Sequence, residues 1–368
     1  MIRLDNAQIA GKLDFMRRYI AANNAADGST MDANANVTQK NIATMEAELM
    51  KDFFVQINRA QVSGKIAQLF GQDCADEYLR QIEAHEIYVH DETSLKPYCV
   101  SVTLYPFLLD GLRTLGGESD APKHLASFCG SFVNLVFAIS AQFAGAVATV
   151  EFLSYFDYFA RKDYGDDYLR SHRAEIANHL QQVVYSINQP AAARGYQSVF
   201  WNISVYDRHS FEAMFGNFVF PDLSRPDWQS VSALQEFFLN WFNQERRRAL
   251  LTFPVVTAAM LTAEGSCKDM PFAQMLAQQL AEGNSFFMYL SDNPDSLASC
   301  CRLRNAVEDR SFSYTLGAGG VATGSINVIS INMNRLEQDG RDLAQEVAKI
   351  HQYQYAYRKL MEDYQAAG

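Results

Sequence analysis

Apolar residues recur along this chain with two periods, one typical of helices and one typical of strands. Intervals of three and four residues predict amphipathic helices, and short runs rich in β-branched and aromatic residues predict strands. The predicted helices are 38–58, 75–84, 168–186, 229–247, 271–282 and 341–364. The predicted strands are 86–90, 98–104, 199–206, 251–257, 286–290 and 326–333. Helices that alternate with short buried strands indicate an α/β fold, either a barrel or a wound sheet.

The most apolar stretch, residues 128–150, contains no charged residue and is long enough to cross a bilayer. Asn134 and Gln142 interrupt it, however, and no basic cluster flanks it. We therefore expect a helix that is buried in the protein core rather than a membrane span.

Composition narrows the possible functions. The 368 residues are 48% hydrophobic and 12% aromatic, which is enough to form a large core. A net charge of −11 argues against a nucleic-acid surface, because binding to phosphate backbones needs clustered Lys and Arg. Six cysteines without a secretory signal fit a reduced cytoplasmic protein better than a disulfide scaffold. We expect no membrane or nucleic-acid partner, and any phosphorylated ligand must be held locally.

Two local features could carry chemistry. Cys300 and Cys301 are adjacent, so they can hardly form an ordinary disulfide, and no CxxC pair suggests a zinc site. Taken alone, neighbouring cysteines are more often small buried hydrophobes. The glycines at 317–324 would let the main chain present N–H groups to an anion, although such a loop is also typical of a flexible turn.

Four motifs occur in a distinctive order along the chain. They are VHD at 89–91 leading to Cys99, TFPVVT at 252–257, SCCRL at 299–303 and GSINVISINMNRL at 324–336. Together they resemble the anaerobic (class III) ribonucleoside-triphosphate reductase family, over roughly residues 30 to 360. Each motif is weak by itself, and the combination is specific.

The resemblance implies a fold and a reaction. The fold is a ten-stranded α/β barrel of the ribonucleotide reductase and glycyl-radical enzyme type, with a cysteine-bearing finger loop through its centre. Residues 1–30 would form a short N-terminal segment without the family's nucleotide-binding cone, and residues 31–368 the catalytic barrel. The implied reaction is the thiyl-radical reduction of ribonucleotides to 2′-deoxyribonucleotides under anaerobic conditions.

The resemblance also implies roles for individual residues. Cys301 would become the thiyl radical that abstracts the ribose 3′ hydrogen, Cys99 would donate hydrogen at the 2′ position, and Asn327 would hydrogen-bond the ribose hydroxyls. Judged alone, Cys99 reads as a buried strand cysteine and Asn327 as a strand-end or turn residue. The predicted substrate-binding residues are His90, Asp91, Ser299, Cys300, Arg302, Gly317, Gly319, Gly320, Gly324 and Ser325.

The sequence departs from the family pattern in two respects. Residues 1–368 contain no glycyl-radical loop and no zinc-binding CxxC pairs. We therefore expect no cofactor or metal in this chain itself, and a glycyl radical supplied by another segment or polypeptide and generated by a radical-SAM activating enzyme. Ser299 stands where formate-using members tend to carry methionine, which argues against formate as the reductant and leaves a thiol reductant open.

The expected ligands and alternatives follow from the same resemblance. The substrate would be a ribonucleoside di- or triphosphate, with a nucleotide effector and a homodimer as further expectations. One alternative is another glycyl-radical enzyme of the pyruvate formate-lyase kind, although Cys99 beside VHD favours the reductase. The other is a catalytically silent nucleotide-binding subunit.

Overall fold

The computed structural model describes residues 4–21, 42–113, 118–190, 197–293, 296–299, 303–306 and 323–367. The chain divides into two compact units, which we call the helical unit and the sheet unit. The helical unit comprises Met1–Met31, Thr38–Tyr98 and Ser325–Gly368, and the sheet unit comprises Asp32–Val37 and Cys99–Gly324. The predicted boundary between residues 30 and 31 lies outside the described residues and stays a prediction.

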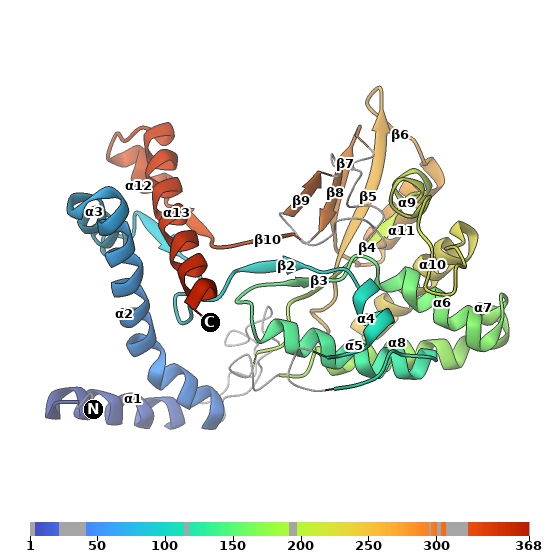
Figure 1. The fold of residues 1–368 in the computed structure, drawn as a ribbon, viewed down its shortest axis with the longest axis horizontal. Coiled ribbons are helices and arrows are strands. Elements are labelled where there is room, and N and C mark those ends of the chain that lie inside the picture. The colour runs from blue at the N-terminus through green and yellow to red at the C-terminus, as the bar shows by residue number, and fades with distance from the viewer. Residues whose placement is uncertain are drawn as a thin grey trace. The chain divides into compact units, whose positions relative to one another are not determined.

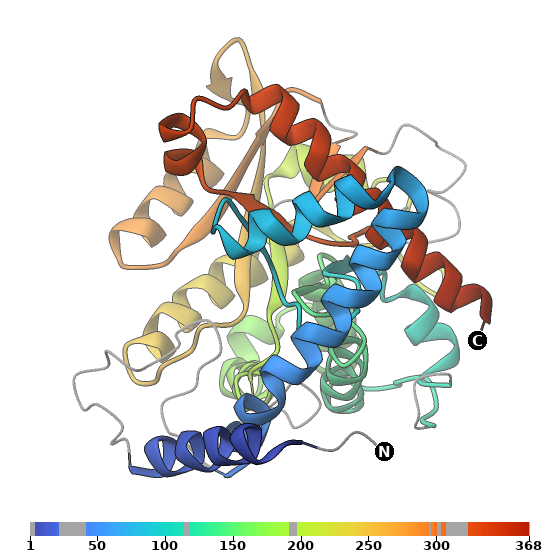
Figure 2. The same cartoon turned by 90° about the vertical axis from the view of Figure 1, so that its left-hand side faces the viewer.

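The helical unit is built mainly from α-helices. Its elements are α1 (Asn6–Ala21), α2 (Ile42–Phe70), α3 (Gln72–Glu83), β1 (Ile87–Val89), β11 (Ile329–Ile331), α12 (Met333–Gln338) and α13 (Leu343–Ala367). The strands β1 and β11 pair antiparallel, with Ile87 opposite Ile331. The helix α13 lies against α2 (Figure 2). Apolar side chains of α2, α3 and α13 meet in a core that includes Ile66, Tyr78, Ile350 and Tyr353.

The sheet unit contains a seven-stranded sheet with the order β10-β2-β3-β4-β5, in which β5 also pairs with β6 and β7. From β2 to β5, and between β5 and β7, neighbouring strands are parallel. The strands are β2 (Cys99–Ser101), β3 (Val147–Ala148), β4 (Trp201–Tyr206), β5 (Val255–Ala263), β6 (Ser266–Cys267), β7 (Phe286–Ser291) and β10 (Thr323–Ser325). Parallel strands need crossover connections, which the helices of this unit provide.

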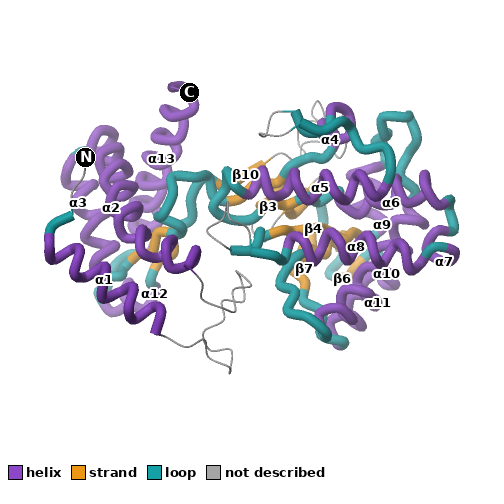
Figure 3. The backbone as a smooth tube through the Cα atoms, turned by 90° about the horizontal axis from the view of Figure 1, so that it is seen from below, coloured by secondary structure: helices purple, strands orange, loops and turns teal. Residues whose placement is uncertain are grey.

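Helices cover one face of this sheet. The helices α5 and α6 adjoin each other, as do α5 and α8 (Figures 1 and 3). The ring centroid of Trp201, on β4, lies 5.6 Å from that of Phe132 on α5 and 5.1 Å from that of Phe152 on α6. The helices are α4 (Tyr105–Asp110), α5 (Leu125–Ser140), α6 (Phe152–Tyr164), α7 (Tyr168–Ser171), α8 (Arg173–Ile187), α9 (Arg208–Phe215), α10 (Trp228–Arg246) and α11 (Met270–Ala281).

A small antiparallel hairpin adjoins the sheet. It consists of β8 (Ser296–Ser299) and β9 (Leu303–Ala306), and β8 lies next to β4, β5 and β7. The hairpin lies on the side of these strands that faces away from α5 (Figure 1). Its position matters because β8 leads directly to Cys300 and Cys301, which fall outside the described residues.

The prediction of a single buried helix at 128–150 was wrong in one respect. The helix α5 ends at Ser140, and after a turn the chain enters β3 at Val147. A buried parallel strand is apolar on both faces, so its residues extend a helical apolar run without any visible change of period. No helix in the described part of the chain is both long enough and apolar enough to cross a membrane.

The single helix predicted at 168–186 is divided into α7 and α8. The other predicted elements agree with the structure in type and differ in length. The helix predicted at 38–58 continues to Phe70, and the strand predicted at 326–333 is only Ile329–Ile331. The strand predicted at 98–104 is Cys99–Ser101, which begins at the expected cysteine. The α/β class is confirmed by the parallel sheet and its covering helices.

Candidate functional site

Cys99 occupies the first position of β2. It is buried, with 8% of its surface exposed, and its Sγ accepts a hydrogen bond from the backbone N–H of Ala146 at 3.3 Å. Because side chains alternate along a strand, Cys99 shares its face of the sheet with Ser101, while Val100 points to the opposite face. The strand therefore fixes which side of the sheet carries the predicted hydrogen donor.

The register of the sheet shows what else lies on this face. Ser101 pairs with Ala148, Ala148 with Asn202, and Asn202 with Val255. Adjacent residues in a parallel sheet point the same way, so these four form one row across β2, β3, β4 and β5. Trp201 precedes Asn202 and faces α5 and α6, so the row lies on the face away from these helices.

Two buried polar side chains on this face, Asn202 and Tyr206, are hydrogen-bonded to protein groups. The side-chain amide of Asn202 donates to Thr257 Oγ1 and to the carbonyl of Val255, both at 3.1 Å. The hydroxyl of Tyr206 donates to the carbonyl of Val150 at 3.0 Å. Burying polar groups is tolerated where they find such partners. This face thus offers small hydrogen-bonding groups, whereas the helix-covered face offers aromatic packing.

The sequence analysis did not single out Ser101, Asn202 or Thr257. A signal exists for Asn202, because Asn202, Ser204 and Tyr206 alternate with apolar residues along β4 in the run WNISVY. A buried strand with polar residues at every second position indicates one face that serves something other than packing.

Gly324 lies beside Cys99. A Cβ atom at Gly324 would stand 2.8 Å from the carbonyl oxygen of Cys99, closer than a side chain tolerates. The glycine is therefore required by the close approach of β10 to β2. Its predicted part in substrate binding stays a prediction, as does that of Ser299, whose backbone closes β8.

Several predicted residues fall outside the part of the chain that the structure describes. They are Cys300, Cys301, Arg302, Gly317, Gly319 and Gly320, so the predicted radical cysteine and anion loop stay predictions.

The remaining predicted residues belong to the helical unit. The ring nitrogen Nε2 of His90 lies 2.9 Å from Ser330 Oγ, which joins the end of β1 to β11. Asp91 has a φ of 52°, a left-handed conformation that turns the chain after VHD. The backbone N–H of Tyr98 donates to the carbonyl of Ser325 at 2.8 Å. These contacts organise the turn that leads into β2.

Asn327 has a side-chain atom without a partner. Its backbone carbonyl accepts a hydrogen bond from the side-chain amide of Gln354 at 3.3 Å. Its Oδ1 is buried and has no hydrogen-bond partner among the described residues. A buried amide oxygen normally has a partner, so Asn327 is a position where a ligand hydroxyl would find an acceptor.

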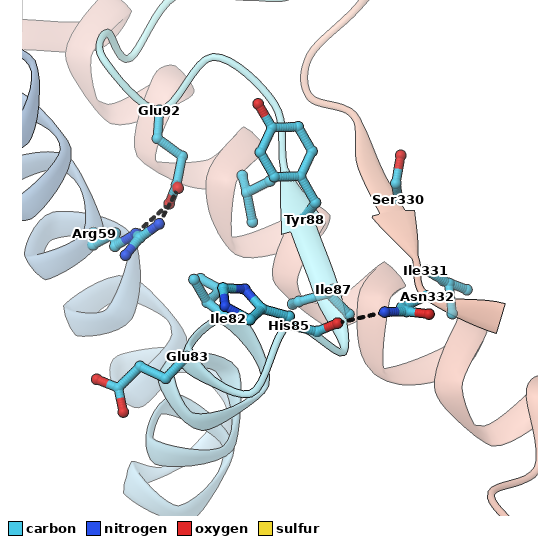
Figure 4. A pocket seen from close by; sticks show the side chains of 11 residues that line it. Arg59, Ile82, Glu83, His85, Ile87, Tyr88, Glu92, Ser330, Ile331 and Asn332 are labelled. Carbon is cyan, nitrogen blue, oxygen red and sulfur yellow. Dashed lines mark hydrogen bonds and ion pairs between the residues drawn. The ribbon is translucent and has the colours of Figure 1, made fainter. Parts of the chain in front are cut away.

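A separate pocket of about 530 Å³ lies in the helical unit, between α2, α3 and the β1–β11 pair (Figure 4). Arg59 and Glu92 form an ion pair at its rim, with Nε 2.7 Å from Oε1. The side-chain amide of Asn332 donates to the carbonyl of His85 at 2.9 Å. The predicted site residues that the structure describes do not line this pocket.

The described residues also bear on metal binding. Within these ranges no group of three or more His, Cys, Asp and Glu side chains is placed to hold a metal ion. One buried carboxylate, Glu151, accepts hydrogen bonds from the hydroxyl of Thr103 at 3.1 and 3.2 Å and from the N–H of Leu104 at 2.7 Å. Its protein partners explain its burial.

The sheet and the site together define an α/β protein that carries a buried cysteine on the polar face of a parallel sheet. A family model described as anaerobic ribonucleoside-triphosphate reductase matches residues 46–368. The chain belongs to this family.

Solved structures agree with this assignment. The anaerobic ribonucleotide reductase from Thermotoga maritima with citrate in the active site is 27% identical, with a TM-score of 0.77, and the match covers 98% of this chain and 64% of that one. A second anaerobic ribonucleotide reductase is 30% identical, with a TM-score of 0.79, and the match covers 98% and 57% of the two chains.

The Thermotoga maritima enzyme in complex with dATP and CTP is 25% identical, with a TM-score of 0.77, over 100% of this chain and 64% of that one. Residues 1–368 therefore span less than two thirds of the length of these proteins. No curated protein matches the chain.

Proposed function

We propose that this chain carries the thiyl-radical chemistry of anaerobic ribonucleotide reduction. Cys301 abstracts the 3′ hydrogen of a ribonucleotide, the 2′ hydroxyl leaves as water, and Cys99 supplies hydrogen at the 2′ position. Cys301 then regains its thiyl radical when the 3′ hydrogen returns to the sugar. Two electrons come from an external reductant, either formate or a thiol, which restores the reduced state of the site.

The observation that carries this proposal is the placement of Cys99. It begins β2 on the polar face of the sheet, with an N–H of Ala146 directed at its sulfur. The hairpin that leads to Cys301 lies on the side of the sheet away from α5, which is also the side of Cys99. This arrangement supports two cysteines that flank one sugar, on a sheet that closes into a ten-stranded barrel around the finger loop.

Substrate recognition is proposed from the remaining groups. Asn327 offers a buried side-chain oxygen without a protein partner among the described residues, suited to a ribose hydroxyl. The substrate is a ribonucleoside di- or triphosphate, and its phosphates are bound by Arg302 and by the backbone N–H groups of the glycine-rich residues 317–324. The dATP and CTP held by the Thermotoga maritima enzyme support a nucleotide substrate and a nucleotide effector.

The radical itself is proposed to come from sequence outside residues 1–368, activated by a radical-SAM enzyme. Cys301 is a relay that must be oxidised to start turnover, and a glycyl radical supplies that oxidation. We further propose that two copies of the chain associate, as a dimer that can also bind the effector.

The test is conversion of CTP to dCTP under anaerobic conditions, with a glycyl-radical segment of the family and its activating enzyme supplied. Cys99→Ser and Cys301→Ser should each abolish turnover while nucleotide binding persists. The matched control is Cys267→Ser, since Cys267 lies on β6 and is only partly buried. Turnover by either site variant contradicts the assigned chemistry. Nucleotide binding without turnover by the wild-type chain favours the silent-subunit alternative.

A further inference from the structure

Ser101 is a buried polar residue on β2 to which the proposed chemistry gives no role. Its surface is 0% exposed, and its hydroxyl oxygen has no hydrogen-bond partner among the described residues. An unpaired buried hydroxyl costs free energy, because the group gives up its bonds to water without replacement. Alanine would fill nearly the same space without that cost, so the hydroxyl calls for an explanation.

Among the described residues, no side chain of a neighbouring strand serves as its partner. On β3 the residue beside Ser101 is Ala148, whose methyl group cannot form a hydrogen bond. On the other side of β2, Gly324, which has no side chain, lies against the backbone of Cys99 and Val100. Farther along the same row, Asn202 already donates to Thr257 and Val255. Within this row, the side chain of Asn202 is hydrogen-bonded to protein groups, whereas the hydroxyl of Ser101 has no partner among the described residues.

The position of Ser101 relates it to Cys99. The two side chains are two residues apart on one strand and share a face, which places their Cα atoms about 7 Å apart. A ribose ring whose 2′ carbon lies against the Cys99 sulfur extends along the strand far enough to bring one of its hydroxyl groups to Ser101. A backbone N–H fixes the sulfur from the side of β3, so the two groups have a defined spacing.

We propose that the Ser101 hydroxyl is a positioning group that hydrogen-bonds one ribose hydroxyl of the ribonucleotide and so holds the sugar in register with Cys99. This assignment rests on the proposed function. It makes Ser101 a determinant of sugar recognition, because a nucleotide that lacks the contacted hydroxyl leaves the serine unpaired. A site of this kind rejects a substrate without the matching hydroxyl more strongly than an apolar pocket does.

The experiment removes the proposed hydrogen bond in two ways: by deleting the hydroxyl of Ser101, and by deleting one ribose hydroxyl of the nucleotide. The affinities of CTP, 2′-deoxy-CTP and 3′-deoxy-CTP are measured by calorimetry on the full chain under anaerobic conditions, for wild type and Ser101→Ala, with dATP present throughout. Loss of one neutral hydrogen bond weakens CTP binding by about tenfold. The substitution should leave unchanged the affinity of the one analogue that lacks the contacted hydroxyl. Ser154→Ala, which removes another buried serine, on α6, is the matched control and should leave all three affinities unchanged.

Each other outcome overturns a specific claim. If Ser101→Ala weakens CTP and both deoxy analogues equally, Ser101 acts through packing and the positioning role is wrong. If it leaves CTP binding at the wild-type value, the serine does not contact the sugar. If the wild-type chain binds no CTP, the proposed function itself fails. Thermal unfolding of both variants establishes that the comparison concerns folded proteins.

Discussion

The two faces of the sheet in the sheet unit are made by the same strands and have opposite characters. On β4, Trp201, Ile203 and Val205 face the covering helices, while Asn202, Ser204 and Tyr206 occupy the other face. All six residues are buried. Burial alone therefore does not separate core from site, and the distinction lies in what each side chain contacts.

Aromatic packing dominates one face and hydrogen bonding the other. Trp201 lies within ring-stacking distance of Phe132 and Phe152, and its indole N–H donates to Thr149 Oγ1 at 2.8 Å. On the opposite face the amide of Asn202 joins β4 to β5. We expect the helix-covered face to supply more of the stability, because burying large aromatic side chains contributes more than neutral hydrogen bonds do.

The sharpest test of this difference is Trp201→Ala. It removes a fully buried indole and leaves a cavity between β4, α5 and α6, so it should lower the free energy of unfolding by about 3–5 kcal/mol. Chemical denaturation monitored by circular dichroism measures the loss. Trp201→Phe keeps an aromatic ring and should lose clearly less. Equal losses for the two variants would show that ring packing is not the main contribution.

The helices that cover the sheet also bury a polar group, the carboxylate of Asp157. Asp157 on α6 accepts hydrogen bonds from the hydroxyls of Tyr168 and Ser230, and burial raises the pKa of Asp157 to about 6. The ordinary pKa of Asp is about 3.9, so the folded state binds the proton more tightly than the unfolded state. Stability contributed by this group is therefore full below pH 4 and is lost as pH rises through about 6.

The corresponding measurement is unfolding free energy against pH, for wild type and Asp157→Asn. The raised pKa of Asp157 corresponds to a fall of at most about 3 kcal/mol in the free energy of unfolding between pH 4 and pH 7, because one pKa unit is about 1.4 kcal/mol. In Asp157→Asn, the part of this pH dependence that comes from Asp157 should be absent. A slope that is unchanged in Asp157→Asn would assign the pH dependence to other groups.

At the contact between β10 and β2, Gly324→Ala should lower the free energy of unfolding by about 2 kcal/mol, because the added Cβ stands 2.8 Å from the Cys99 carbonyl and forces the strands apart. Gly130→Ala is the control: Gly130 lies within α5 and a Cβ there meets nothing within 4 Å. That substitution should be neutral or slightly stabilising, since alanine favours helix. Urea denaturation of both variants decides whether close strand packing explains Gly324.

The smallest expected effect is that of Asn202→Ala, about 1–2 kcal/mol, because Thr257 and the Val255 carbonyl lose a donor while little volume is removed. Thermal unfolding measures it beside Ile203→Val, a small deletion on the opposite face that should cost a similar amount. A loss at Asn202 as large as that at Trp201 would mean that the polar face carries as much stability as the aromatic one.

The sequence by itself determined the elements whose pattern is local. The helices around 75–84, 229–247 and 271–282 match the structure closely, because amphipathic spacing acts within a few residues. The strand at Cys99 is correct in type and shorter than predicted. The ordered motifs also identified the family. The assignment of Cys99 as a site residue stays a prediction, to which the structure adds the face of the sheet and the contact with Ala146.

Only the tertiary structure decided features that depend on pairing between distant segments. The strand β3 was hidden in an apolar run, and it becomes a strand because β2 and β4 lie on either side of it. The need for glycine at Gly324 arises from a carbonyl more than two hundred residues earlier in the chain. The unpaired hydroxyl of Ser101 is likewise visible only once Ala148 is known to be its neighbour. Strand register is a non-local property, so no local pattern of residues specifies it.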